Sequence, residues 1–235
     1  MNRICFLTYS LVLCFFCTVS AQKTEHSKWT GILQTYVTEN GNVNYKNLQK
    51  NRAVLSDYLS DLASNSPKDN WSSSETKAYW INAYNAYTVQ LILDNYPLKS
   101  IKDLNDPWGQ TFFKINGEMM SLNTIEHKIL RSMGDPRIHF AIVCASESCP
   151  KLLNYAYESE TLSDQLNQAA KEFINDSSKN SLTASQITIS KIFKWFKSDF
   201  PKGIAFINYL NNYSTLKIHP ETKINYQNYN WSLNE

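Results

Sequence analysis

The chain has 235 residues, of which 43% are hydrophobic and 19% are charged. That length allows one substantial domain or two small ones with a buried core. Its 23 basic and 21 acidic residues nearly cancel, which argues against nucleic acid or an anionic membrane surface as the natural partner. No internal repeat or Pro/Gly-rich linker divides the sequence, so we expect a single domain.

The first 21 residues have the pattern of a secretory signal peptide. Arg3 precedes an apolar run over residues 4–19, and residues 19–21 form a small-residue cleavage site. The run is shorter than the roughly 20 residues of a membrane span, and no later segment approaches that length. We therefore expect residues 22–235 to be exported, without a membrane span, to the periplasm or the outside medium.

Export changes the meaning of the cysteines. Three of the five lie in the leader, which leaves Cys144 and Cys149 as a pair. Paired cysteines in an oxidising compartment usually form a disulfide. Loss of Arg3 also takes the 23 basic residues to 22, against 21 acidic ones, so the mature chain stays close to neutral.

The N-terminal part is expected to be mainly helical. Apolar residues at helical spacing predict helices over residues 29–37, 54–62 and 75–96. Residues 39–45 supply a turn and a brief strand between the first two. Ser72 and Glu75 match a capping box at the start of the third helix, and Pro97 ends it.

From residue 111 onward, short strands join the helices. Asn116-Gly117 predicts a tight hairpin, and Asn123 with Glu126 predicts a capped helix over residues 124–133. The alternation of Ile138, Phe140 and Ile142 predicts a half-buried strand. The remaining predicted elements are a helix at 162–174, a strand at 187–190, helices at 191–196 and 203–213, and an extended tail at 228–234. Helices outnumber strands, so we expect an α+β class: a single helix-rich domain with a small, mainly antiparallel sheet.

The segment RIHFAIVCASESCP, residues 137–150, concentrates reactive side chains. On a regular strand His139 and Cys144 point to opposite faces, so they meet only if the strand breaks before Cys144. Pro150 favours the start of a helix after it, which would place Cys149 at an N-cap where the helix dipole lowers the pKa of a thiol. This makes Cys149 the better nucleophile of the two cysteines.

The cysteine pair admits several interpretations. A disulfide across this short loop would stabilise the fold by less than the usual value of about 2–4 kcal/mol, because it constrains little of the unfolded chain. A thiol nucleophile would need His139 or His127 as its base. The Cys-x4-Cys spacing also approaches that of zinc sites, with the same two histidines as further ligands. Redox catalysis is less favoured, because its usual motif is Cys-x-x-Cys.

Three polar residues are candidates for substrate binding. Asn82 and Asn85 lie three residues apart on an apolar helix and share one face. They either line a pocket or act as buried amides that hold neighbouring loops, and the second role is the more common. Arg137 either binds a carboxylate of a ligand or pairs with Glu126 or Asp135.

Six segments in fixed order give the chain a family resemblance: AYWINAYNAYTVQLIL, IKDL, INGEMMSLNTIEHKIL, DPRIHFAIVCASESCPKL, ISKIFKWFKSDF and NYNWSLN. From about Asn44 to Asn234 the chain resembles the bacterial family called domain of unknown function 547 (DUF547). The resemblance implies no established activity. It places the family's motifs on Trp80, Asn82, Tyr84 and Asn85, on Ile125, Glu126 and His127, and on Arg137, His139, Cys144, Ser146, Ser148, Cys149 and Pro150.

Two classes of function follow as hypotheses. As an enzyme, the chain would carry out thiol-dependent acyl transfer or amide hydrolysis, with Cys149 or Cys144 as nucleophile, His127 or His139 as base and Glu126 orienting that base. As a non-enzymatic cell-envelope module, it would bind a peptide, a glycan or another exported protein, with the cysteines as a staple. The sequence has no recognisable cofactor loop, so neither hypothesis includes a cofactor.

Overall fold

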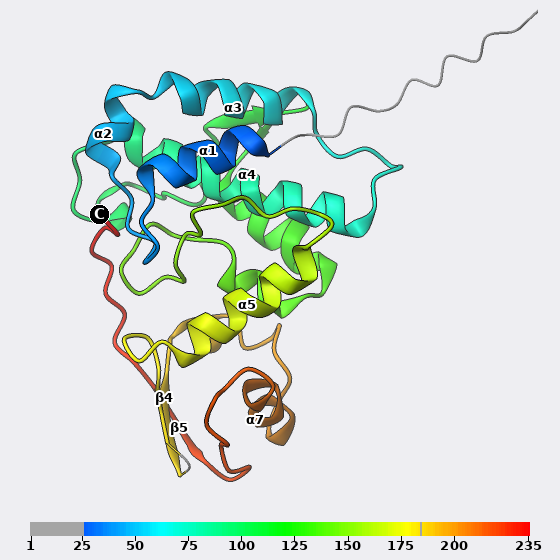
Figure 1. Cartoon of the computed structure of the whole chain (residues 1–235), viewed down its shortest axis with the longest axis vertical. Coiled ribbons are helices and arrows are strands. Elements are labelled where there is room, and N and C mark those ends of the chain that lie inside the picture. The colour runs from blue at the N-terminus through cyan, green and yellow to red at the C-terminus, as the bar shows by residue number, and fades with distance from the viewer. Residues whose placement is uncertain (1–25, 184) are drawn as a thin grey trace, which may run out of the picture.

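The computed structural model describes residues 26–183 and 185–235 (Figure 1). The predicted signal peptide lies outside these residues and stays a prediction. The α-helices are α1 (Ser27–Tyr36), α2 (Tyr45–Lys50), α3 (Ala53–Ser64), α4 (Ser73–Asp94), α5 (Leu162–Asn175), α6 (Ile192–Trp195) and α7 (Ile204–Asn211). Shorter helical turns are η1 (Ile101–Asp103), η2 (Thr124–Leu130), η3 (Arg131–Met133) and η4 (Pro136–Phe140). The strands are β1 (Phe113–Ile115), β2 (Glu118–Met120), β3 (Ser181–Leu182), β4 (Gln186–Ile189) and β5 (Lys223–Tyr226).

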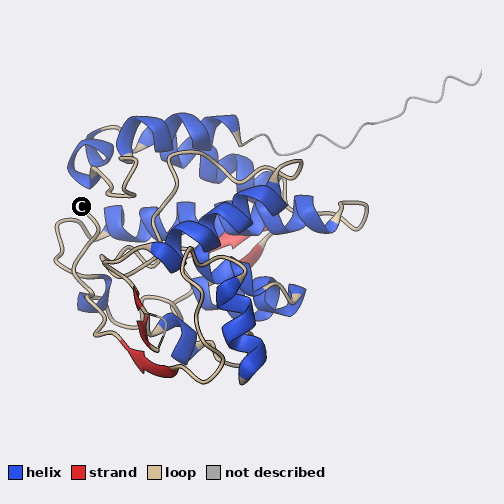
Figure 2. Cartoon of the chain, turned by 60° about the horizontal axis from the view of Figure 1, so that its bottom comes forward, coloured by secondary structure: helices blue, strands red, loops and turns tan. Residues whose placement is uncertain are grey.

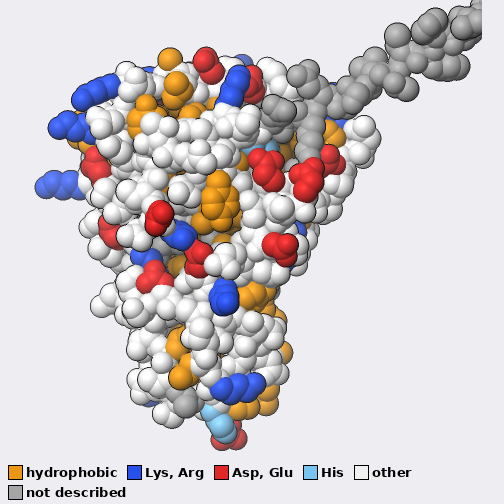
Figure 3. Space-filling view, in the orientation of Figure 1, with side chains coloured by type: hydrophobic (Ala, Val, Ile, Leu, Met, Phe, Trp, Pro, Cys, Tyr) orange, Lys and Arg blue, Asp and Glu red, His pale blue; other side chains and the backbone are white. Residues whose placement is uncertain are grey.

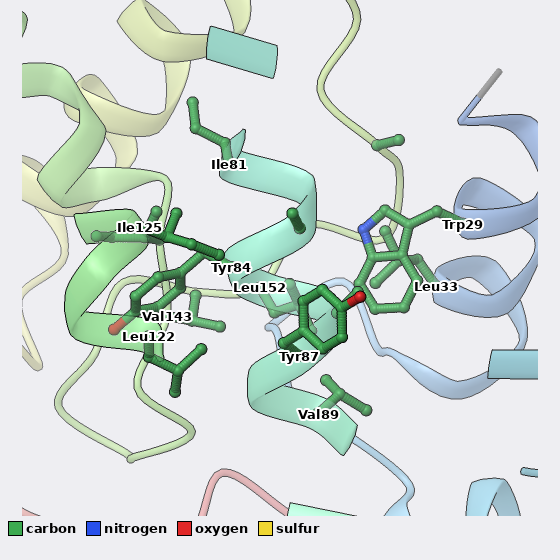
Figure 4. Packing of buried hydrophobic residues seen from close by; sticks show 14 of the residues in the cluster. Trp29, Leu33, Ile81, Tyr84, Tyr87, Val89, Leu122, Ile125, Val143 and Leu152 are labelled. Atoms are coloured by element: carbon green, nitrogen blue, oxygen red, sulfur yellow. The ribbon is translucent and has the colours of Figure 1, made fainter. Parts of the chain in front are cut away.

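Helix α4 is the centre of the larger hydrophobic cluster. The predicted capping box is confirmed: Ser72 accepts from the Glu75 amide, and the Glu75 carboxylate accepts from the Ser72 amide. Most of α4 is buried on every side, as expected of a helix that is apolar all round. Figure 4 shows Trp29 and Leu33 of α1 on one side of α4, and Leu122 and Ile125 on the other.

The strands form two small sheets, which agrees with the predicted helix-rich α+β class (Figure 2). β1 and β2 make the predicted antiparallel hairpin, whose turn residues Asn116 and Gly117 have φ angles of 52° and 80°. In the second sheet β4 pairs antiparallel with β3 and parallel with β5. This sheet packs with α5, α6 and α7 around a second hydrophobic cluster.

The C-terminal tail runs from β5 to the N-terminal part of the domain. In Figure 1 it runs from β5, near the bottom of the view, up to the C-terminus at the upper left, below α2. The Leu233 amide donates to the Lys99 carbonyl, and the Asn234 carbonyl accepts from the Val43 amide. The same tail pairs with the cysteine loop through a bridge between Ser146 and Leu233. The tail therefore fixes the cysteine loop against the N-terminal helices.

The predicted strand at residues 138–142 is wrong, because residues 136–140 form the 3₁₀ helix η4. Pro136 occupies its first turn, and the Asp135 carboxylate caps it by accepting from the Arg137 amide. The alternation of apolar residues has another cause: Ile138 packs in the larger cluster, whereas Phe140 packs in the smaller one. The opposite-face argument for His139 and Cys144 therefore does not apply.

Two predicted local features nearby are also wrong. No helix begins at Pro150, since residues 151–161 run as loop and turn, so Cys149 does not sit at an N-cap. Asn123 has a helical backbone and makes no side-chain cap. The hydroxyl of Ser121 instead accepts from the Thr124 amide and caps this helical segment.

Candidate functional site

An aromatic cavity of about 230 Å³ brings together most of the predicted site residues. Its wall includes Glu126, His127, His139, Cys144 and Cys149. The aromatic side chains around them are Tyr84, Trp108, Trp195, Phe196, Tyr229 and Trp231. We call this space the aromatic cavity. A small, largely apolar cavity with a few converging polar groups is the usual form of a ligand or active site.

Cys144 and Cys149 form the disulfide expected from their pairing. Three donors surround the sulfur of Cys149: the Cys144 amide at 2.9 Å, the Tyr229 hydroxyl at 3.3 Å and the Ser146 hydroxyl at 3.4 Å. The Tyr229 hydroxyl lies equally close, at 3.3 Å, to the sulfur of Cys144. The environment of Cys149 is therefore already arranged to stabilise negative charge on its sulfur.

His139 is buried and held by a carboxylate. Its Nε2 lies 2.8 Å from Oδ2 of Asp199, and its ring stacks on Phe196 at 4.1 Å between centroids. Asp199 also binds Arg131 through two bonds, from Nε at 2.6 Å and Nη2 at 2.7 Å. The Arg131 hydrogen bonds hold the pKa of Asp199 well below its usual range. An ionised Asp199 fixes the tautomer of His139, whose Nε2 carries the proton and donates it.

The second ring nitrogen of His139 is unused. Nδ1 is buried and has no hydrogen-bond partner among the described residues. Burial lowers the pKa of His139 to about 4, although Asp199 opposes this shift. At neutral pH His139 is thus a neutral imidazole that carries a free lone pair on Nδ1. This form of the ring can accept a proton, and its pKa of about 4 makes it a weak base at neutral pH.

His127 is in a different state. It is exposed, and its Nδ1 accepts a hydrogen bond from Arg131 Nη1 at 3.0 Å. Burial of part of the ring, followed by the charge of Arg131, lowers its pKa. Because Arg131 always donates, the lone pair on Nδ1 is taken and Nε2 carries the proton. Of the two predicted bases, His139 is the one with a free acceptor nitrogen.

Glu126 lies on the π-helical segment η2, where Arg131 N–H bonds back to the Glu126 carbonyl. Such segments are frequent at functional sites. The carboxyl is 7% exposed and accepts from the Tyr84 hydroxyl at 3.2 Å. Burial raises the pKa of Glu126 to about 7, while Tyr84 and Arg131 oppose the shift. A carboxyl with this pKa exchanges protons at neutral pH. Within the part of the chain that the structure describes, no hydrogen bond joins it to either histidine, as orientation of a base would require.

The three predicted substrate-binding residues lie elsewhere. Asn82 donates to the Tyr157 carbonyl and accepts from its amide, and Asn85 does the same with Ala141 and Val143. Both act as buried amides that hold loops, and neither lines the aromatic cavity. Arg137 forms a two-bond ion pair with Asp135, at 2.9 and 2.8 Å.

Sequence reasoning did not single out Asp199, Arg131 or Tyr229. Asp199 lies 60 residues from its partner His139, and Tyr229 lies 80 residues from Cys149. No local spacing predicts such contacts. A signal was nevertheless present, since Asp199 ends the segment ISKIFKWFKSDF and Tyr229 lies in NYNWSLN, both of which belong to the family resemblance.

A zinc site needs a group of ligands, and a membrane span needs a long apolar helix. In the described part of the chain, no three His, Cys, Asp or Glu side chains are grouped as metal ligands. The cysteines that would have supplied two ligands are bonded to each other. Across residues 26–183 and 185–235, no helix combines the length and the apolar character that a membrane crossing needs.

Comparison with known proteins gives one match. The family model described as "Protein of unknown function, DUF547" matches residues 68–174. The matched segment contains α4, η2, η4 and the cysteine loop, whereas Asp199 and Tyr229 lie beyond it. No curated protein and no solved structure matches the chain. The match to residues 68–174 agrees with the resemblance of the sequence to the DUF547 family.

Proposed function

We propose that the protein is an exported, thiol-dependent enzyme of acyl transfer or amide hydrolysis, with Cys149 as nucleophile and His139 as base. A dithiol reductant first opens the Cys144–Cys149 bond, because a bonded sulfur has no thiolate to offer. The observation that carries the proposal is that Cys149 and His139 line one cavity, with the free Nδ1 of His139 backed by Asp199.

Each residue has a defined role in this scheme. Reduction leaves the Cys149 sulfur beside the Cys144 amide and the two hydroxyls, which favour the thiolate over the thiol. His139 takes the thiol proton on Nδ1, and the resulting imidazolium is stabilised by Asp199. A nucleophile, a base and a group that orients the base are the parts that covalent acyl transfer requires.

Alkylation of single-cysteine variants tests the proposal without a reductant. Cys144→Ser leaves Cys149 as the free thiol, and Cys149→Ser is the matched control that leaves Cys144. We expect the chloroacetamide reaction rate, measured against pH by mass spectrometry, to reach half its maximum at a lower pH for Cys149. Adding His139→Gln or Asp199→Asn should move that midpoint upward. Identical pH profiles for the two thiols, with no response to His139→Gln, would refute the assignment.

The second candidate function is a binding module of the cell envelope. The supporting observation is the exposed aromatic rim: Trp195 is 46% exposed and lies 5.7 Å from Trp231 between ring centroids. Rings at the mouth of a cavity suit a peptide or a glycan. A double Cys144→Ser, Cys149→Ser variant separates the candidates, since it abolishes a thiol enzyme but leaves ligand binding by a folded module intact.

A further inference from the structure

A second cavity adjoins the cysteine loop. It measures about 550 Å³ and is lined by the loop after α1, the end of α5, residues 146–153 and the chain terminus. We call it the polar cleft, because amides, hydroxyls and charged groups form much of its wall. Figure 3 shows acidic and basic side chains interspersed on this face of the molecule, beside α5.

The two cavities meet at the nucleophile. Within the described part of the chain, Cys149 and Pro150 are the only residues that line both. The Cys149 sulfur contacts one residue from the wall of each cavity. The Ser146 hydroxyl, from the polar cleft, lies 3.4 Å from the sulfur, and the Tyr229 hydroxyl, from the aromatic cavity, lies 3.3 Å from it; the two hydroxyls are 3.5 Å apart. Cys149 therefore borders two chemically different spaces.

The size and lining of the aromatic cavity suit an acyl donor. Its volume of about 230 Å³ holds a group no larger than one amino-acid side chain. Six aromatic rings line it, and its two histidines have lowered pKa values that keep them neutral. An aromatic or aliphatic acyl group fits this environment, since burial of apolar surface supplies its binding energy.

The charges of the polar cleft suit an amine. Its wall carries three acids, Glu147, Glu172 and Asp176, against two lysines. Both lysines are engaged: Lys151 pairs with Glu172 at 2.5 Å, and Lys179 donates to the Glu147 carbonyl. Three acids against two lysines leave the cleft an excess of one negative charge, which favours a cationic ligand over an anionic one.

We infer that the enzyme transfers an acyl group from an apolar donor in the aromatic cavity to a peptide primary amine in the polar cleft, rather than to water. This inference rests on the proposed thiol chemistry. The Cys149 sulfur attacks the donor carbonyl and gives its proton to His139. The leaving group departs with that proton, and a thioester remains. The ammonium group held in the cleft first releases one proton to solvent. The neutral amine then attacks the thioester, gives a further proton to His139 Nδ1 and displaces the thiolate.

A partition experiment tests the transfer step. Wild-type protein is opened with a phosphine, which adds no competing thiol, and is given p-nitrophenyl phenylacetate as donor. The acceptor is Nα-acetyl-lysine methyl ester, and its norleucine counterpart, which lacks the amine, is the control. Mass spectrometry measures the ratio of amide to acid product and the acyl group on Cys149.

The expected result is an amide-to-acid ratio that rises with the lysine acceptor and saturates, as it does when the acceptor binds. Glu147→Gln should lower that ratio at least fivefold at subsaturating acceptor. Two results would overturn the transfer inference but not the proposed thiol enzyme. One is acylation of Cys149 that yields acid alone; the other is an amide-to-acid ratio that rises linearly with acceptor and does not change in Glu147→Gln. Absence of acylation at Cys149 overturns both.

Discussion

Replacement of Asn85 by alanine tests how the cysteine loop is held in place. The Asn85 amide donates to the Ala141 carbonyl at 2.9 Å and accepts from the Val143 amide at 2.9 Å. The side chain is 1% exposed, so water does not reach these two backbone groups. Asn85→Ala removes the hydrogen-bond partner of both backbone groups at once, in the segment directly before Cys144.

The expected loss follows from the two groups left behind. A buried backbone donor or acceptor without a partner costs about 1–3 kcal/mol, so the pair costs about 2–6 kcal/mol. We expect the free energy of unfolding to fall by about 4 kcal/mol. A domain of ordinary stability, about 5–15 kcal/mol, remains folded after such a loss.

Asn82→Ala is the matched control. Asn82 makes the same two bonds to Tyr157, at 2.8 and 3.0 Å, in the loop eight residues beyond Cys149 rather than in the segment before Cys144. Urea unfolding followed by tryptophan fluorescence should show similar losses for both variants. Hydrogen exchange should separate them: the Val143 amide accelerates in Asn85→Ala, and the Tyr157 amide in Asn82→Ala. A loss below about 1 kcal/mol, or unchanged Val143 exchange, would refute the reasoning.

Three further predictions concern titration and close packing. Burial raises the pKa of Glu126 to about 7, so the native state resists ionisation of this carboxyl. As pH rises from about 4.5 to 7, the free energy of unfolding of the wild type should therefore fall by about 3 kcal/mol relative to that of Glu126→Gln, as measured by urea unfolding. Burial raises the pKa of Asp135, but hydrogen bonds from Arg137 and Lys77 outweigh it and lower that pKa to about 2. The wild type should accordingly lose about 2 kcal/mol between about pH 4 and 2, a loss that Asp135→Asn does not show. A Cβ on Gly41 would lie 2.5 Å from Lys151 Cβ at φ +86°, so Gly41→Ala should lower the thermal midpoint, whereas Gly31→Ala, in open space on α1, should raise it slightly.

The helices and the hairpin were predictable because their signals are local. The capping box at Ser72, the apolar run of α4 and the Asn116-Gly117 turn each act within a few residues. Helix α2 was missed, since its six residues bury only Tyr45 and Leu48 and give no apolar stripe. The pattern before Cys144 misled because Ile138 and Phe140 belong to different clusters, so their alternation did not reflect the two faces of a strand.

The site was predictable only in part, because some of its contacts join residues that are far apart in the sequence. The cysteines, His139 and Glu126 fall within 24 residues of one another and were identified together. Their partners were not, because Asp199 comes from the turn after α6, 50 residues beyond Cys149, and Tyr229 comes from the tail, 80 residues beyond it. Tertiary packing alone decides that His139 meets Asp199 while His127 meets Arg131. Since these two contacts decide which imidazole keeps a free lone pair, the choice of base could not be made from the sequence.

The C-terminal tail makes the site depend on the completed fold. Tyr229 reaches both sulfurs, the Asn230 carbonyl accepts from the Ser148 amide, and the Asn234 amide donates to the Ala145 carbonyl. Ala145 has a φ of 54°, a conformation that costs an L-residue free energy and needs surrounding contacts to hold it. The tail supplies those contacts on both sides of Cys149. The shape of the cysteine loop therefore depends on its contacts with residues 229–234.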